Sequence, residues 1–134
     1  MRTINVTGSA GLIGSETVKR FAKEGAHVVG IDNDMRAQFF GAEASRKRTR
    51  DSLSAKVRGH EHYDLDVRDT SAVAKLFKSH SGKIDAIVHT ASQPSHDWAP
   101  RDPQTDFTVN ANRTLARRCE TIFSRSAVYL YVDK

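Results

Sequence analysis

The chain has 134 residues, of which 38% are hydrophobic and 28% charged, and its formal net charge is +5. This length suits one domain with a hydrophobic core, and the composition excludes disordered, fibrous and membrane-spanning proteins. Because Met1 and Arg2 lead directly into a strand-like segment without an apolar leader, and because the one cysteine, Cys119, cannot form an internal disulfide, we expect a single cytoplasmic domain over residues 1–134.

The first part of the sequence has the pattern of a strand, a tight loop, a helix and a second strand. Residues 3–7 (TINVT) are typical of a strand that stops at Gly8. Between Gly14 and Gly25, apolar residues recur at helical intervals and charged residues take the opposite face. Residues 27–31 (HVVGI) form a compact apolar run, which indicates a strand buried on both faces of a parallel sheet.

The rest of the chain alternates in the same way after an irregular stretch. Residues 33–59 show no sustained period, and we expect a loop with short helices there. The later elements are predicted in this order: a strand at 61–65, a helix opened by Asp69 or Thr70, a strand at 85–90, a long helix from about Gln104 to Phe123 and a strand at 127–132.

This alternation of strands and helices predicts an α/β protein. Right-handed crossovers would give a Rossmann-type, doubly wound parallel sheet of about five strands in the order 3-2-1-4-5. The sequence stops soon after the fifth strand, so we expect a truncated domain whose exposed sheet edge favours self-association or a homodimer.

Three glycines at intervals of three follow the first strand. In the segment TGSAGLIG, Gly8 permits the turn out of the strand, Gly11 removes a Cβ where a pyrophosphate could approach the backbone, and Gly14 lets the helix pack closely on the sheet. The amino terminus of the helix then offers N–H groups to phosphates. The alternative is that these glycines serve turn geometry alone.

Asp32 ends the second strand, 18 residues after Gly14. A carboxylate at this position can accept hydrogen bonds from a ribose hydroxyl pair, and it would repel a 2′-phosphate, so we expect NAD rather than NADP. Arg36 is near enough in the sequence to leave NADP open. Asp32 could also be a turn former beside Asn33 and Asp34.

Several segments together resemble one family. These are TGSAGLIG after the first strand, Asp32-Asn33 after the second, Asp66-Val67 after the third, HTAS after the fourth and VNANRTL on the long helix. They are similar to the NAD-dependent epimerase/dehydratase family of extended short-chain dehydrogenase/reductases. Within that family, IDNDMRAQFFG and HTASQPSHDW most resemble nucleotide-sugar 2-epimerases of the CDP-paratose/CDP-tyvelose type.

The resemblance implies roles for particular residues. NAD would contact Gly8, Gly11, Leu12, Ile13, Gly14, Asp32, Asn33, Asp66, Val67, Thr90, Ala91, Ser92 and Asn110. Asp66 would hydrogen-bond the adenine amino group while Val67 packs against the ring, residues 90–92 would line the nicotinamide, and Asn110 would lie near the phosphates. A nucleotide-sugar substrate would face Gln93, Ser95 and His96. Asp66 could instead merely cap a turn, and Gln93 and His96 could be ordinary loop residues.

Catalysis in this family uses a Tyr-x-x-x-Lys pair, in which the lysine charge favours the tyrosine phenolate that takes a proton during hydride transfer. The sequence has no such pair: Val67 stands four residues after Tyr63, Asp133 stands four after Tyr129, and Tyr131 is followed by only three residues. We therefore expect no catalytic residue here, and NAD binding without turnover. The chain would be the amino-terminal part of a nucleotide-sugar epimerase, an isomerase, or a degenerate copy of one.

Two other signals receive a different interpretation. The segment Arg46 to Arg58 contains six basic residues and one acidic residue, so it carries the whole net charge. A nucleic-acid-binding or regulatory module is the alternative that it raises. No aromatic residue is interleaved from Ser45 to His62, which favours a solvated basic loop.

Metal and thiol chemistry are not expected. His60, His62 and Asp64 could face one side of a strand and bind zinc, but an exposed polar strand face is the preferred interpretation, and we expect no metal. Cys119 lies on the apolar stripe of the predicted long helix, which favours core packing over nucleophilic catalysis.

Overall fold

A computed structural model describes residues 1–80, 83–93, 97, 100–109 and 128–131. Within these residues the chain forms a parallel sheet with the strand order β3-β2-β1-β4-β5, as predicted. The strands are β1 (Thr3–Thr7), β2 (His27–Ile31), β3 (His60–Tyr63), β4 (Ile84–His89) and β5 (Val128–Tyr131).

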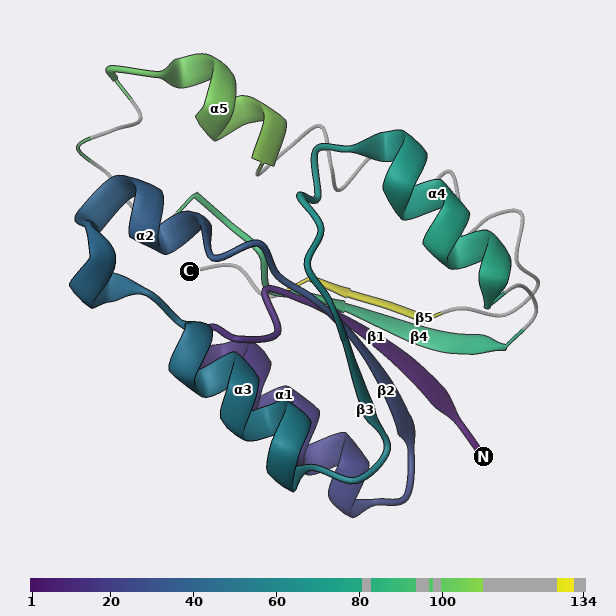
Figure 1. The fold of residues 1–134 in the computed structure, drawn as a ribbon. Coiled ribbons are helices and arrows are strands. Elements are labelled where there is room, and N and C mark those ends of the chain that lie inside the picture. The colour runs from purple at the N-terminus through teal and green to yellow at the C-terminus, as the bar shows by residue number, and fades with distance from the viewer. Residues whose placement is uncertain (81–82, 94–96, 98–99, 110–127, 132–134) are drawn as a thin grey trace.

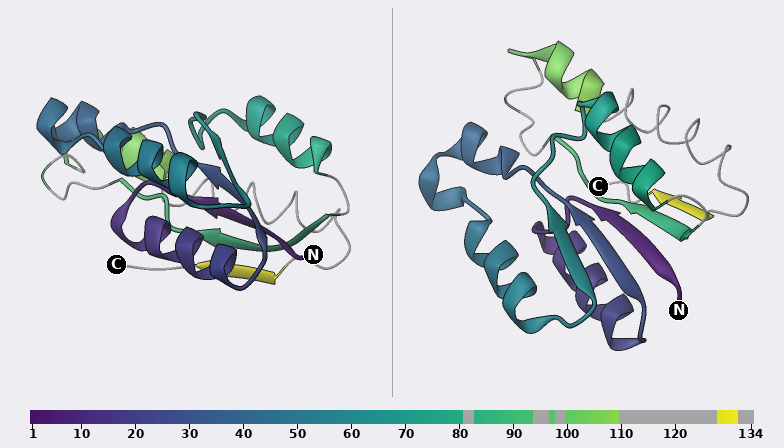
Figure 2. Two further views of the ribbon diagram at one scale, coloured as in Figure 1. Left: turned by 60° about the horizontal axis from the view of Figure 1, so that its bottom comes forward. Right: turned by 45° about the vertical axis from the view of Figure 1, so that its right-hand side comes forward.

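Helices cover both faces of the sheet. Figures 1 and 2 show α1 and α3 on one face and α4 on the other. None of the described helices combines the length and the apolar character needed to cross a bilayer. The helical elements are α1 (Leu12–Lys23), α2 (Met35–Phe40), the 3-10 turn η1 (Ala42–Ala44), α3 (Lys47–Lys56), α4 (Thr70–Ser79) and α5 (Pro103–Phe107).

The core consists of two apolar layers separated by the sheet. Because side chains alternate along a strand, Val28 packs with Val18 and Leu53 under α1 and α3. Its neighbour Val29 packs with Leu76 of α4 in the other layer. The prediction that residues 27–31 are buried on both faces is thus confirmed: four of the five residues of β2 are buried.

Element ends depart slightly from the predictions. The third strand ends at Tyr63 rather than at 65, because the Leu65 N–H donates to the Tyr63 carbonyl at 3.1 Å and the chain turns there. Asp69 caps α4 as predicted, since its carboxylate accepts from the Ala72 N–H at 2.9 Å. Of the predicted long helix the structure describes only its beginning, which forms α5; residues 110–127, with Cys119, lie outside the described residues.

The short helices predicted within residues 33–59 are present as α2, η1 and α3, but the interpretation of the basic run as a loop was wrong, because residues 47–56 form the ten-residue helix α3. Leu53 of this helix is only 2% exposed and packs in the core with Val57 beside it. One apolar anchor within ten residues gives no visible helical stripe in the sequence, although lysine, arginine and alanine all favour a helix. The basic side chains are therefore placed by a helix packed on the sheet.

The prediction of an exposed strand face was also wrong for His60 and His62. Both imidazoles are half-buried on the side of the sheet that faces α1 and α3. Gly30 of β2 makes room for His60, because a Cβ there would lie 2.6 Å from His60 Nε2 and 2.8 Å from Ser9 Oγ. Loss of water, and secondly the nearby His62, lower the pKa of His60 to about 4.

This lowered pKa predicts that acid destabilises the fold. The unfolded chain takes up a proton on His60 near its ordinary pKa of 6.5, whereas the folded chain does so only near 4. The free energy of unfolding should therefore fall as the pH drops from 6.5 toward 4, by up to about 1 kcal/mol per pH unit for this half-buried ring. Urea unfolding between pH 5 and 6.5 measures the slope. His60→Leu should make it shallower, and an unchanged slope would contradict this account.

Candidate functional site

A cavity of about 460 Å³ lies where the carboxyl ends of β1, β2 and β4 meet the amino terminus of α1. Open α/β sheets bind ligands at this edge, and the volume is within the range for small-molecule sites. Most of the predicted cofactor residues line this cavity: Gly8, Gly11, Leu12, Ile13, Gly14, Asp32, Asn33, Val67, Thr90, Ala91 and Ser92.

Two glycines, Gly8 and Gly14, let the turn after β1 pack tightly against the neighbouring strand and against α1. Gly8 has a φ of +68°, and its N–H donates to the Ile31 carbonyl at 2.7 Å. A Cβ on Gly8 would lie 2.8 Å from the Ala91 nitrogen, and a Cβ on Gly14 would overlap the Gly8 carbonyl. Larger residues at either position would therefore push the turn away from the strands or from α1.

Gly11, in contrast, is less enclosed than Gly8 and Gly14. The one neighbour of a Cβ there would be the Gly8 oxygen, at 3.2 Å. Gly11 is the N-cap of α1 and provides no side-chain cap, so the first N–H groups of the helix are free of side-chain acceptors. Leu12 and Ile13 beside it are 75% and 51% exposed, which is unusual for large apolar residues. This helix end can therefore receive an anionic group together with apolar surface.

Asp32 is attached to the glycine turn. Its Oδ2 accepts from the Ala10 N–H at 3.1 Å and its Oδ1 accepts from the Asp34 N–H at 2.8 Å. A carboxylate has about four acceptor positions, so both oxygens keep the capacity to accept from a ligand. The structure thus brings the predicted carboxylate and the predicted turn together at one edge of the cavity.

Two arginines of the cavity depend on the conformation of Asp34. Arg36 and Arg46 both line the cavity near Asp32. Asp34 has a φ of 56°, and its carboxylate accepts from the Arg46 N–H and from the Ser45 hydroxyl, each at 2.6 Å. Arg36 was predictable from its nearness to Asp32 in the sequence, whereas Arg46 was missed, because this left-handed turn brings the start of α3 beside the end of β2. Asp is among the residues that tolerate this conformation, but the sequence alone does not mark it.

The end of β4 is tied to the end of β1 by polar contacts. The Thr90 hydroxyl donates to the Thr7 carbonyl at 2.7 Å, and the Ala91 N–H donates to Thr7 Oγ1 at 3.3 Å. Thr7 Oγ1 also lies 2.6 Å from Nδ1 of the buried His89. These bonds hold residues 90–92 at the cavity.

The remaining predicted residues do not all reach the cavity. Val67 lines it, but Asp66 forms an ion pair with Arg68 at 2.7 Å, and this hydrogen-bonded carboxylate raises the pKa of Arg68. Gln93 is buried and is absent from the lining among the residues described. The adenine contact of Asp66 and the substrate contact of Gln93 stay predictions. Ser95, His96 and Asn110 lie outside the described residues.

The chain is similar to known epimerases. The sequence profile of the NAD dependent epimerase/dehydratase family matches residues 4–129. The UDP-glucose 4-epimerase of Mus musculus is 32% identical over 115 residues, which are 86% of this chain and 32% of that protein. Because this relative is named a 4-epimerase, the resemblance to 2-epimerases stays a prediction.

Solved structures show the same fold. The UDP-Glc/GlcNAc 4-epimerase of Campylobacter jejuni superposes with a TM-score of 0.79 at 24% identity, over 98% of this chain and 36% of that one. UDP-glucose 4-epimerase of Bifidobacterium longum, in complex with NAD⁺ and UDP, gives 0.79 at 21% identity, over 98% and 37%. The chain therefore spans about a third of the length of the proteins it matches.

Gly14 and Gly11 should respond differently when each is replaced by alanine, which adds one methyl group. Gly14→Ala should lower the free energy of unfolding by about 1–3 kcal/mol, because its Cβ overlaps the Gly8 carbonyl. Gly11→Ala should cost less than about 1 kcal/mol, because its φ of −70° suits alanine and its Cβ would meet only the Gly8 oxygen, at 3.2 Å, rather than overlap it. Urea unfolding of both variants tests this, and equal losses would refute the assignment of the two roles.

Proposed function

Because this chain belongs to the NAD-dependent epimerase/dehydratase family, we propose that residues 1–134 bind NAD in the cavity at the carboxyl ends of β1, β2 and β4. The observation that carries the proposal is the bond between Asp32 and the Ala10 N–H, which places a carboxylate against the glycine turn at the cavity edge. Such a pairing suits a ligand that has a phosphate and a ribose close together.

The pyrophosphate of NAD would lie at the start of α1. Gly11 leaves the backbone bare there, and the uncapped first turn supplies N–H donors and the positive end of the helix dipole. Leu12 and Ile13, exposed beside the turn, would be covered by the bound cofactor. Exposed apolar side chains beside an anion site are consistent with a ligand that has both anionic groups and apolar surface.

The adenosine ribose would be held by Asp32, with Asn33 beside it. The two oxygens of Asp32 each accept one backbone N–H and would accept the ribose hydroxyls as well. A 2′-phosphate would be repelled by this carboxylate, which favours NAD. Arg36 and Arg46 line the same cavity and would be the residues that hold a 2′-phosphate if Asp32 were removed.

The two ring systems would take opposite ends of the cavity. Val67 would pack against adenine, with Asp66 hydrogen-bonding its amino group, and residues 90–92 would line the nicotinamide. Asn110 would lie near the phosphates. When bound, NAD would supply a hydride acceptor for sugar oxidation. The fixed positions of residues 90–92, tied to Thr7, would orient that ring.

The whole protein would be a nucleotide-sugar epimerase. Its relatives act on UDP-sugars by name, and a sugar nucleotide would face Gln93, Ser95 and His96. Residues 1–134 contain no Tyr-x-x-x-Lys pair, so we expect them to bind the cofactor without turnover. The nucleic-acid alternative has less support, because the basic side chains of Arg46, Lys47 and Arg50 line a small hollow together with the acidic residues Asp32, Asp34 and Asp64.

Removing the carboxylate tests the proposal most directly. Asp32→Ala should weaken NAD binding roughly 10- to 100-fold, the effect of losing hydrogen bonds to a charged group. NADP binding should weaken less or improve, because the repulsion is lost while Arg36 and Arg46 remain. Isothermal titration calorimetry with both nucleotides gives the two affinities.

Asp51→Asn is the matched control, because it removes one negative charge from the exposed side of α3, away from the cavity lining. It should leave both affinities within about twofold. Absence of NAD binding by the unaltered chain, or equal losses in the two variants, would overturn the proposal.

A further inference from the structure

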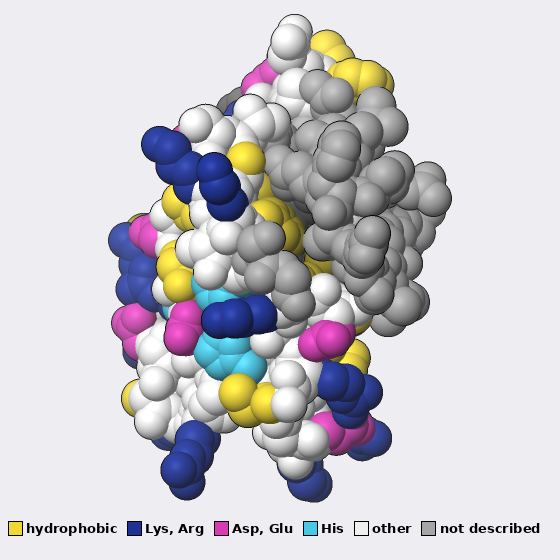
Figure 3. Space-filling model, turned by 90° about the vertical axis from the view of Figure 1, so that its right-hand side faces the viewer, with side chains coloured by type: hydrophobic (Ala, Val, Ile, Leu, Met, Phe, Trp, Pro, Cys, Tyr) yellow, Lys and Arg dark blue, Asp and Glu magenta, His cyan; other side chains and the backbone are white. Residues whose placement is uncertain are grey.

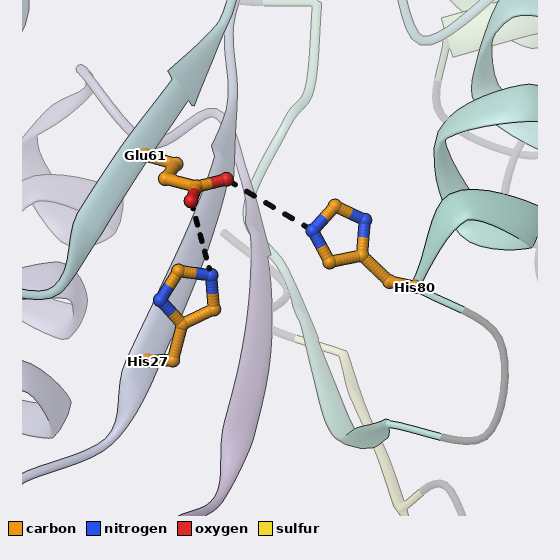
Figure 4. Close-up of side chains that lie close together, drawn as sticks. All are labelled: His27, Glu61 and His80. Carbon is orange, nitrogen blue, oxygen red and sulfur yellow. Dashed lines mark ion pairs between the residues drawn. The ribbon is translucent and has the colours of Figure 1, made fainter.

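Two imidazoles and a carboxylate from three elements meet at the end of the sheet opposite the cavity. His27 is the first residue of β2, Glu61 is the second of β3, and His80 is the C-cap of α4. Figure 4 shows the Glu61 carboxylate between the two rings, with one oxygen toward each. Their ligand atoms all lie within 4.8 Å of one another, the one such group among the described residues.

The spacing of these atoms is close to that of a metal site. His27 Nε2 lies 3.7 Å from Glu61 Oε1, and His80 Nε2 lies 3.9 Å from Oε2. Ligand atoms about 2 Å from a tetrahedral ion are roughly 3.3 Å apart. All three ligand atoms lie within 4.8 Å of one another, so side-chain movements of roughly an ångström would bring them to this spacing.

A backbone partner behind His80 orients its ring. His80 Nδ1 lies 3.0 Å from the Leu76 carbonyl and 3.1 Å from the Ser79 hydroxyl. With Nδ1 on that side, Nε2 is the ring nitrogen that faces the Glu61 carboxylate. A carbonyl partner behind a histidine is typical of metal ligands.

Other features of the cluster favour a cation. The Tyr63 hydroxyl donates to Glu61 Oε2 at 3.0 Å, which orients the carboxylate. His80 ends α4, where the negative end of the helix dipole lies. The side chains of His27, His80 and Glu61 are 20%, 15% and 49% exposed, so an ion can reach them from solvent. Figure 3 shows histidine side chains gathered on the surface, with acidic and basic side chains around them.

We propose that His27, Glu61 and His80 form a Zn²⁺ site, with water as the fourth ligand. Two imidazole nitrogens and one carboxylate oxygen are a donor set that suits zinc. The ion would join β2, β3 and α4 and stabilise the end of the sheet at which these strands begin. The site is independent of the nucleotide cavity, since His27 begins the strand that Asp32 follows. His60 and His62 take no part, because they lie on the other face of β3.

The test is zinc titration of the purified, tag-free chain after chelator treatment. Calorimetry should give one ion per chain, and Co²⁺ should give the visible absorption of a tetrahedral N/O site. Glu61→Gln and His80→Gln should each lower the zinc affinity at least tenfold. At a hundredfold excess over Kd, zinc should raise the Tm of the unaltered chain by roughly 5–10 °C, and this rise should be lost in both variants.

His62→Gln is the matched control, a histidine of the same strand on the other face, and should bind zinc like the unaltered chain. The Tm of each variant without metal shows whether it is folded. The proposal is overturned if no zinc binds, if His62→Gln loses as much affinity as His80→Gln, or if folded Glu61→Gln and His80→Gln keep full affinity. In the last two cases the cluster is an ion pair between Glu61 and protonated histidines only.

Discussion

The structure depends on the close contact between the glycine turn after β1 and the ends of the two neighbouring strands. Gly8 approaches Ala91 so closely that no side chain fits, and its N–H is bonded to the carbonyl of Ile31. Because the turn is fixed to both neighbours, α1 must start over the crevice between them. The cavity, the free N–H groups and the position of Asp32 all follow from this one arrangement of backbone.

The features that were predicted correctly are those that the sequence specifies locally. An apolar run of only five residues between Gly25 and Asp32 indicates a strand with two covered faces, and β2 was placed to the residue. The glycine spacing and Asp32 were recognisable because turn geometry and a single carboxylate depend on few neighbours. The strand order followed from the alternation of elements and the handedness of crossovers.

The features that were missed depend on contacts between distant parts of the chain. Helix α3 buries one residue, Leu53, so it has no apolar period to detect. Arg46 reaches the cavity only because Asp34 takes a left-handed conformation. On β3, alternate residues enter two different environments: His60 and His62 are desolvated beside Gly30, whereas Glu61 meets His27 and His80. A pattern of polar residues cannot distinguish a solvated strand face from one that is covered by partners.

The buried polar contacts of β1 have a consequence for how the strands align. A strand that is apolar on both faces can slide by one residue and still bury its side chains, so hydrophobicity alone leaves the alignment ambiguous. The Asn5 amide donates to the Val29 carbonyl at 3.0 Å, and Thr7 meets His89. The side chains of Asn5, Thr7 and His89 are inaccessible to water, so any shifted pairing would leave buried polar atoms without hydrogen-bond partners. The polar side chains of β1 therefore permit only one alignment of β2 and β4 beside it.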